Sequence, residues 1–91
     1  MDGLIEGRIV HFVLADGRSP GEHRPAIVVK VWRNTDNTPP ANGCSNLQVF
    51  TDSNPEGKYN DELPPIMWAT SILHDEDTKA PHSWHWPEIE T

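Results

Sequence analysis

The C-terminal segment His82–Glu88, with the sequence His-Ser-Trp-His-Trp-Pro-Glu, concentrates aromatic and imidazole side chains. If it is a strand, side chains alternate between its faces, so Trp84 and Trp86 share one face and His85 lies on the other. Two tryptophans on one face can cap a hydrophobic core, which is the commoner role of large aromatic side chains. They can also stack on nucleotide bases, at about 1–3 kcal/mol per base. We therefore take Trp84, His85 and Trp86 as candidate ligand-binding residues.

The histidines of this region do not form a pattern that is typical of a metal site or of a catalytic site. His82 and His85 would point to opposite faces of a strand, and no His-x-x-x-His spacing or cysteine pair accompanies them. His74 precedes the acidic run Asp75–Asp77, a pattern typical of a solvated turn. The sequence contains no nucleophile elbow and no phosphate-binding glycine loop. We therefore predict no metal site, no cofactor and no catalytic residues.

The segment Gly17–Pro25 has the residues best suited to hold a phosphate group. Arg18 and Arg24 each offer a planar fork of N–H donors, and His23 lies beside them. Backbone N–H groups of a glycine-bearing loop can approach the same anion. The alternative is a solvated hairpin connection in which Arg24 pairs with a carboxylate.

Three further polar residues are candidates for hydrogen bonds to a ligand. His11 lies on the Ile9 face of the first expected strand, where a partly buried, hydrogen-bonded imidazole is the more ordinary role. Thr70 and Ser71 lie near the end of the fourth expected strand and can donate hydrogen bonds to base edges or phosphate.

The charge distribution limits the class of partner. The net charge of −7 disfavours a long nucleic acid, whose binding depends on basic contacts to phosphate. Residues 1–33 contain five basic and four acidic side chains, a net of +1, whereas residues 34–91 contain two and ten, a net of −8. A small anion therefore finds its best site in the first third of the chain.

Five short segments rich in β-branched and aromatic residues predict an all-β fold. Polar loops are expected at about 34–46 and 52–65, and Asp16-Gly17 is a strong turn signal. No segment has helical apolar spacing over three turns. The spacing favours a small SH3-like barrel or a strongly bent antiparallel sheet of five to six strands. The expected strands are Arg8–Leu14, Ala26–Trp32, Leu47–Thr51, Ile66–Ile72 and Ser83–Trp86.

The nearly continuous apolar run of the second strand is typical of a strand buried on both faces. The predicted core residues are Ile9 or Val10, Ile27, Val29, Val31, Val49 and Ile66.

Length and composition favour a single domain over residues 1–91. Cys44 is the only cysteine, so no internal disulfide forms. No stretch approaches the roughly 20 apolar residues of a membrane span, and the N-terminal residues lack the pattern of a signal peptide. We therefore expect a cytoplasmic protein without a membrane partner. A domain this small gains stability by association, so we expect a homo-oligomer.

Three segments, Gly7–Phe12, Arg24–Val28 and Ser83–Glu88, together resemble a family of short phage and prophage proteins. Those proteins begin Gly-Arg-Ile-Val-His-Tyr and end Trp-His-Trp-Pro-Glu, and the resemblance covers roughly residues 7–88. The departure is Phe12, which stands where tyrosine is common and lacks its hydroxyl. Small phage proteins of this kind include sponges that capture nucleotide signals of bacterial immunity, such as the cyclic dinucleotides of CBASS.

The resemblance implies a non-enzymatic phage protein that sequesters a small nucleotide immune signal in the cytoplasm of the infected host. One alternative is a protein–protein adaptor or inhibitor with an SH3-like surface, whose tryptophans grip a peptide. A second is a nucleotide-cleaving enzyme that uses His74, His82 or His85 as general acid or base.

Overall fold

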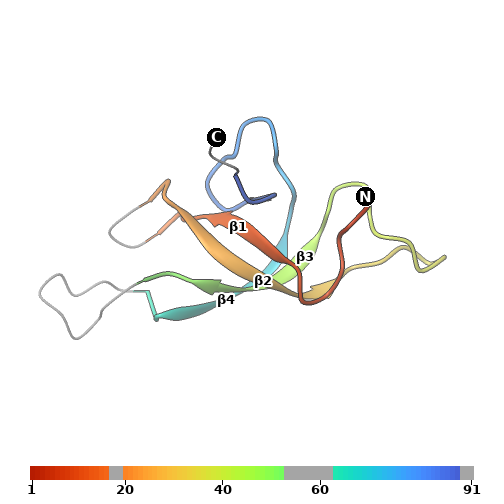
Figure 1. Ribbon diagram of the computed structural model, residues 1–91, viewed down its shortest axis with the longest axis horizontal. Helices are drawn as coiled ribbons and strands as arrows, with labels where there is room; N and C mark the ends of the chain where they lie inside the picture. The colour runs from red at the N-terminus through yellow and green to blue at the C-terminus, as the bar shows by residue number, and fades with distance from the viewer. Residues whose placement is uncertain (17–19, 53–62, 89–91) are drawn as a thin grey trace, which may run out of the picture.

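The computed structural model describes residues 1–16, 20–52 and 63–88, and these form a five-stranded antiparallel sheet (Figure 1). The described residues contain no helix, so the all-β prediction is confirmed. Each expected strand is present, with ends that differ from the prediction by no more than about three residues. The strands are β1 (Ile9–Val13), β2 (His23–Val31), β3 (Ser45–Phe50), β4 (Ile66–Ile72) and β5 (Trp84–His85).

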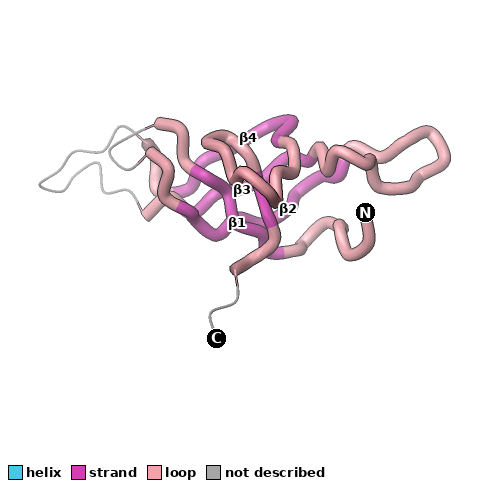
Figure 2. The backbone as a smooth tube through the Cα atoms, turned by 90° about the horizontal axis from the view of Figure 1, so that it is seen from above, coloured by secondary structure: helices cyan, strands magenta, loops and turns pink. Residues whose placement is uncertain are grey.

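The sheet is open, with the strand order β4-β3-β2-β1-β5. β4 and β5 form opposite edges, and β5 is only two residues long. Of the two expected arrangements, the bent sheet forms and the closed barrel does not. After β4 the chain crosses the sheet and returns along β1, which places the C-terminal segment beside the first strand (Figure 1). The strands occupy the middle of the molecule and the loops extend from it (Figure 2).

The core lies on one face of the sheet, under the N-terminal residues and the segment that leads to β5. Trp84 is fully buried there, and its indole N–H donates to the Gly43 carbonyl at 2.8 Å. Gly43 has a positive φ of 69°, which favours glycine. The buried cluster consists of Leu4, Val10, Phe12, Leu14, Ala26, Val28, Val31, Leu47, Val49, Ala69, Ile72 and Trp84.

Part of the predicted core is wrong. Val10, Val31 and Val49 are buried as expected, but Val29 and Ile66 are exposed. Val28 is buried in place of Val29, because β2 alternates between a covered and an uncovered face over much of its length. A register shift between Val28 and Lys30 then carries Val31 back into the core.

The opposite face of the sheet is largely uncovered in the described part of the chain, and the segment after β5 lies over its β1–β5 edge. Cross-strand pairs run across it from Ile9 to Ile27, from Ile27 to Gln48 and from Gln48 to Trp68. Ile9 is 46% exposed and Trp68 is 50% exposed. We call this the outer face; Phe50 and Ile66, which pair with each other, extend it. Among the described residues, no helix is long and apolar enough to cross a membrane.

Candidate ligand-binding site

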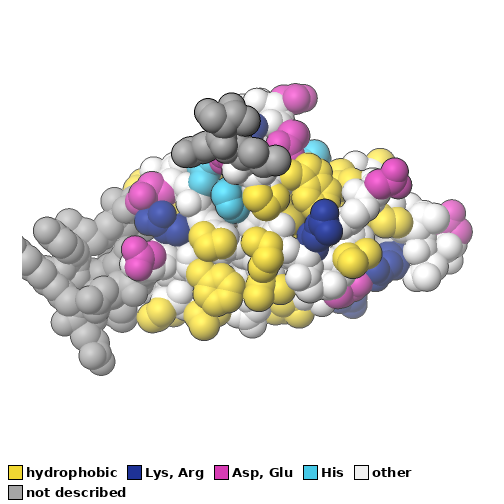
Figure 3. Space-filling view, viewed as in Figure 1, with side chains coloured by type: hydrophobic (Ala, Val, Ile, Leu, Met, Phe, Trp, Pro, Cys, Tyr) yellow, Lys and Arg dark blue, Asp and Glu magenta, His cyan; other side chains and the backbone are white. Residues whose placement is uncertain are grey.

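A groove of about 540 Å³ lies where the start of β1 meets the segment that follows β5. Its lining is Arg8, Ile9, Trp86 and Pro87. The Arg8 guanidinium carbon lies 5.7 Å from the centroid of the Trp86 ring, within the range of a cation–π contact. The groove thus combines a cation, an indole ring and aliphatic surface in one place. In the space-filling view, hydrophobic side chains gather over the middle of the face, next to histidines (Figure 3).

Backbone hydrogen bonds hold each side of the groove in place. Gly7 adopts a φ of 90° and donates its N–H to the Val28 carbonyl at 2.7 Å, which sets Arg8 at the entry to β1. On the other side, the Trp86 N–H donates to the Glu76 carboxylate at 3.0 Å. Trp86 also packs edge to face against Trp84, with ring centroids 5.0 Å apart. The buried tryptophan therefore supports the half-buried one.

Three histidines gather next to the groove around the carboxylate of Glu88. His11 and His85 are cross-strand partners on β1 and β5, and their ring centroids lie 5.7 Å apart. His23, at the start of β2, lies 4.6 Å from the His85 ring. His85 Nε2 is 2.7 Å from Glu88 Oε1, and His23 Nδ1 contacts the same oxygen.

The pKa values of Glu88 and His85 follow from their surroundings. Hydrogen bonds from His23 and then His85 lower the pKa of Glu88 to about 2. Burial lowers the pKa of His85, and its bond to Glu88 opposes that shift. At neutral pH the carboxylate is therefore ionised and the His85 ring is neutral.

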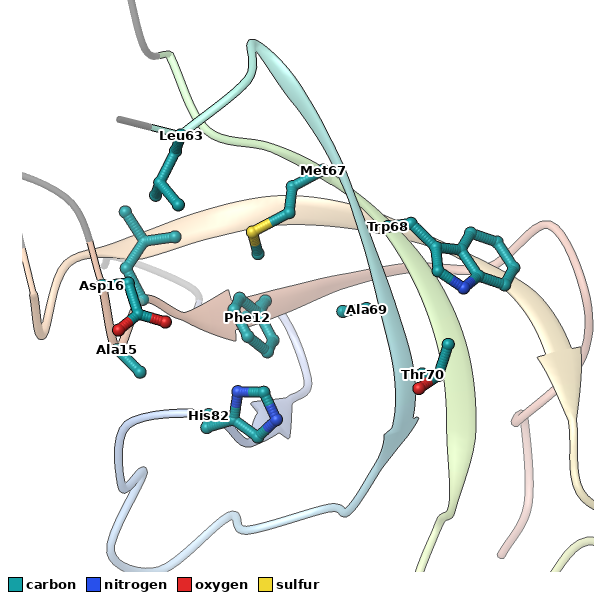
Figure 4. Close-up of a pocket in the computed structure, with 10 residues that line it drawn as sticks. Phe12, Ala15, Asp16, Leu63, Met67, Trp68, Ala69, Thr70 and His82 are labelled. Carbon is teal, nitrogen blue, oxygen red and sulfur yellow. The ribbon is translucent and has the colours of Figure 1, made fainter. Parts of the chain in front are cut away.

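A second pocket, of about 210 Å³, opens at the far end of β1, toward β4. Phe12, Met67 and His82 point into it, while the Trp68 ring lies on the other side of β4 (Figure 4). Its volume is below the roughly 300–1,000 Å³ of most small-molecule sites, and its lining contains the acidic Asp16 but no lysine or arginine. It suits an anion less well than the groove does.

The two tryptophans that were candidates for a stacking platform differ in burial. Trp84 is fully buried, so it offers no ring face to a ligand in this conformation, whereas Trp86 lines the groove. His85 is also fully buried, and of the three histidines predicted to bind the ligand, His11 and His23 are partly accessible. Of the sequence-predicted residues, the structure brings together His11, His23, His85 and Trp86.

The other candidates lie elsewhere. Arg24 lies within β2 and not in the expected solvated connection. It donates from Nε to the Thr51 carbonyl at 3.0 Å, and it pairs with the Glu22 carboxylate at 3.1 Å, the kind of pairing that the alternative expected. Thr70 lines the second pocket. Ser71 has a positive φ of 55°, and its backbone N–H donates to a side chain of β3. Arg18 lies outside the described residues.

The histidines proposed for general acid–base catalysis have different surroundings. His74 bonds to Glu76 at 3.0 Å, and His82 packs edge to face against Phe12. His85 instead belongs to the cluster with His11. The described residues therefore do not bring these three histidines together as a set.

Sequence reasoning missed Arg8 and Glu88 as site residues. Both lie within the segments that carry the family resemblance, and Arg8 belongs to the first third of the chain, where positive charge outweighs negative. The sequence did not reveal that β5 pairs with β1. This pairing brings residues more than 70 positions apart into one site.

No family model, curated protein or solved structure matches this chain. The described residues form a small, open, all-β sheet. The geometry of the groove and of the neighbouring histidines is the basis for the function proposed below.

Proposed function

We propose that the protein is a non-enzymatic binder of a small anionic ligand with a planar ring, of the nucleotide class, held in the groove of Arg8, Ile9, Trp86 and Pro87. The observation that carries the proposal is the state of Arg8. Of the three described arginines, Arg24 and Arg33 each pair with a glutamate, whereas Arg8 forms no ion pair within the described residues.

A nucleotide matches the groove in both of its parts. The guanidinium of Arg8 can hold phosphate oxygens through two parallel N–H bonds. The indole of Trp86 offers a partner for base stacking, which contributes about 1–3 kcal/mol per base. The volume of about 540 Å³ falls within the roughly 300–1,000 Å³ typical of small-molecule sites.

The specific form of the proposal is sequestration of a cyclic dinucleotide immune signal by a phage protein in the host cytoplasm. The family resemblance supports it, because the segments that carry the resemblance supply Arg8, Ile9, Trp86 and Pro87. A sponge needs affinity and no chemistry, and it returns its ligand unchanged when it unfolds.

Calorimetric titration with a panel of cyclic dinucleotides and mononucleotides, followed by heat denaturation and chromatography of the released ligand, tests this function. The proposal expects saturable binding of at least one nucleotide and recovery of that nucleotide intact. Cleaved products would favour the nucleotide-cleaving alternative. Absence of binding across the panel would overturn the proposal and favour the adaptor.

We also propose that the protein forms a homo-oligomer through the β3–β4 part of the outer face, which leaves Ile9 free to line the groove. Phe50, Ile66 and Trp68 expose apolar surface there, and a second copy would cover it with an equally apolar surface. A stable interface of about 1,600 Å² persists at micromolar concentration.

Light scattering on the parent protein and two lysine variants tests the assembly. Ile66→Lys charges the outer face, and Ile5→Lys is its control, because the two side chains are 54% and 55% exposed and Ile5 lies outside the sheet. The parent and Ile5→Lys should have a multiple of the 10.3 kDa chain mass, and Ile66→Lys should have that mass itself. A monomeric parent would contradict the proposal.

A further inference from the structure

Three imidazole rings converge on one carboxylate oxygen. Glu88 Oε1 is in contact with His23 Nδ1, lies 2.7 Å from His85 Nε2 and lies 3.8 Å from His11 Nδ1. The rings come from β2, β5 and β1, which are neighbours in the sheet, and the carboxylate comes from the segment after β5.

The register of the sheet explains the convergence. His11 lies directly opposite His85 across the β1–β5 pair. On its other side, His11 lies opposite Pro25, and His23 is two residues from Pro25 on the same face of β2. Directly opposed and diagonal side chains on one face of a sheet come within reach of each other. The three rings are thus brought together by backbone pairing.

Hydrogen bonding within the described residues leaves part of this cluster unsatisfied. His11 Nδ1 and His85 Nδ1 are buried and have no hydrogen-bond partner there. His85 is completely buried, and buried polar atoms are normally paired. His11 Nδ1 lies close to the carboxylate without bonding to it. An additional group between His11 and Glu88 would pair this atom.

We propose that His11, His23, His85 and Glu88 bind a divalent transition metal ion of the Zn²⁺ class. Three imidazole nitrogens and one carboxylate oxygen form a donor set that suits this class. Mg²⁺ and Ca²⁺ prefer oxygen ligands throughout, so the three nitrogens select against them. The site is separate from the groove and does not depend on the ligand proposed there.

Donor atoms of His11, His85 and Glu88 all lie within 4.8 Å of one another, so these three residues need only small movements. His23 contacts Glu88 but is not part of this group, so its ring must reorient further to become the fourth ligand. Tetrahedral coordination with bonds of about 2.0–2.1 Å separates neighbouring donors by about 3.3 Å. The 3.8 Å separation from His11 must shorten and the 2.7 Å separation from His85 must lengthen, each by about half an ångström. Glu88 is the partner best placed to move, because its side chain is 46% exposed.

Titration of tag-free protein, stripped with a chelator, with ZnCl₂ in the calorimeter tests the site. We expect one Zn²⁺ per chain with a Kd of about 1 µM or tighter. CoCl₂ gives a second readout, because tetrahedral Co²⁺ absorbs visible light far more strongly than octahedral Co²⁺. MgCl₂ should give no binding. Nucleotide is absent throughout, so this test and the groove test fail independently.

Variants locate the ion. His11→Gln and Glu88→Gln should weaken Zn²⁺ binding at least about 10-fold. Replacement of a residue that only supports a metal ligand already lowers metal affinity by about 10- to 100-fold. His82→Gln is the matched control, because it removes an exposed histidine that is not in the cluster and should leave the Kd unchanged. Circular dichroism confirms that each variant is folded. Absence of Zn²⁺ binding to the parent at 100-fold excess, or equal affinity in all three variants and the parent, overturns the proposal.

Discussion

Replacement of Gly43 by alanine should destabilise the fold at the point where the loop before β3 supports β5. An added Cβ would lie 2.6 Å from the His74 Cβ and 2.8 Å from Trp84 Cζ2, distances that require these neighbours to shift. Trp84 is fully buried and bonded to the Gly43 carbonyl, so its ring has little freedom to move. The substitution therefore disturbs the residue that precedes His85.

The cost has two parts. A positive φ of 69° costs a residue with a Cβ about 1–2 kcal/mol. The steric conflict adds about 1–3 kcal/mol, the range for overpacking a core. Gly21→Ala is the control, because Gly21 has a φ of 89° and no atom of the described residues lies within 4 Å of the added Cβ. It should lose only the first part.

Urea denaturation followed by circular dichroism and tryptophan fluorescence measures both variants. Gly43→Ala should be less stable than Gly21→Ala by about 1–3 kcal/mol, which corresponds to a further decrease in Tm of at least about 4 °C. Equal losses in the two variants would show that Gly43 is not closely packed against Trp84. Contacts other than the packing of Trp84 on Gly43 would then hold β5 in place.

Two further predictions concern the sheet and an ion pair. Val28→Ala should cost about 1.5–3 kcal/mol in urea denaturation, because Val28 is fully buried, whereas Val29→Ala should cost under about 0.5 kcal/mol, because Val29 is 41% exposed; similar costs would contradict the observed alternation of β2. Hydrogen bonds from Arg33 and then the Val31 backbone lower the pKa of Glu6 from 4.5 to about 2. The folded-state pKa is depressed, so this stabilisation is present above pH 4.5 and is lost as the pH falls toward 2. Over that interval the parent should lose more stability than Glu6→Gln, by up to about 1 kcal/mol for a partly exposed pair; parallel pH profiles would contradict this assignment.

The sequence predicted the strands because period-2 alternation and turn residues are local signals. It did not predict which face of β2 is covered, because Val28 and Val29 are equally apolar and the segment that covers the face is distant in sequence. The sequence also did not show that the sheet stays open. β5 contains only two residues and pairs with β1, so both edges of the sheet remain open and no barrel closes.

The candidate site was predicted in part. His11, His23, His85 and Trp86 were named from residue type, and the structure places them around the β1–β5 edge of the sheet. Their mutual arrangement depends on strand order, which residue types do not encode. Arg8 and Trp86 are far apart in the sequence, so their contact was not predicted.

The most direct test of the proposed function is a calorimetric comparison of Arg8→Ala with Lys30→Ala, using the nucleotide that binds the parent most tightly. Both substitutions remove one positive charge that lies over a tryptophan ring, since Lys30 Nζ is 3.9 Å from the centroid of the Trp32 ring outside the groove. Loss of a charge-assisted hydrogen bond, about 1.5–3 kcal/mol, should weaken binding to Arg8→Ala about 10- to 150-fold. Lys30→Ala should bind within about two-fold of the parent, because a distant surface charge is screened by salt. Equal affinities of the two variants, or a parent that binds no nucleotide, would contradict the assignment of the groove.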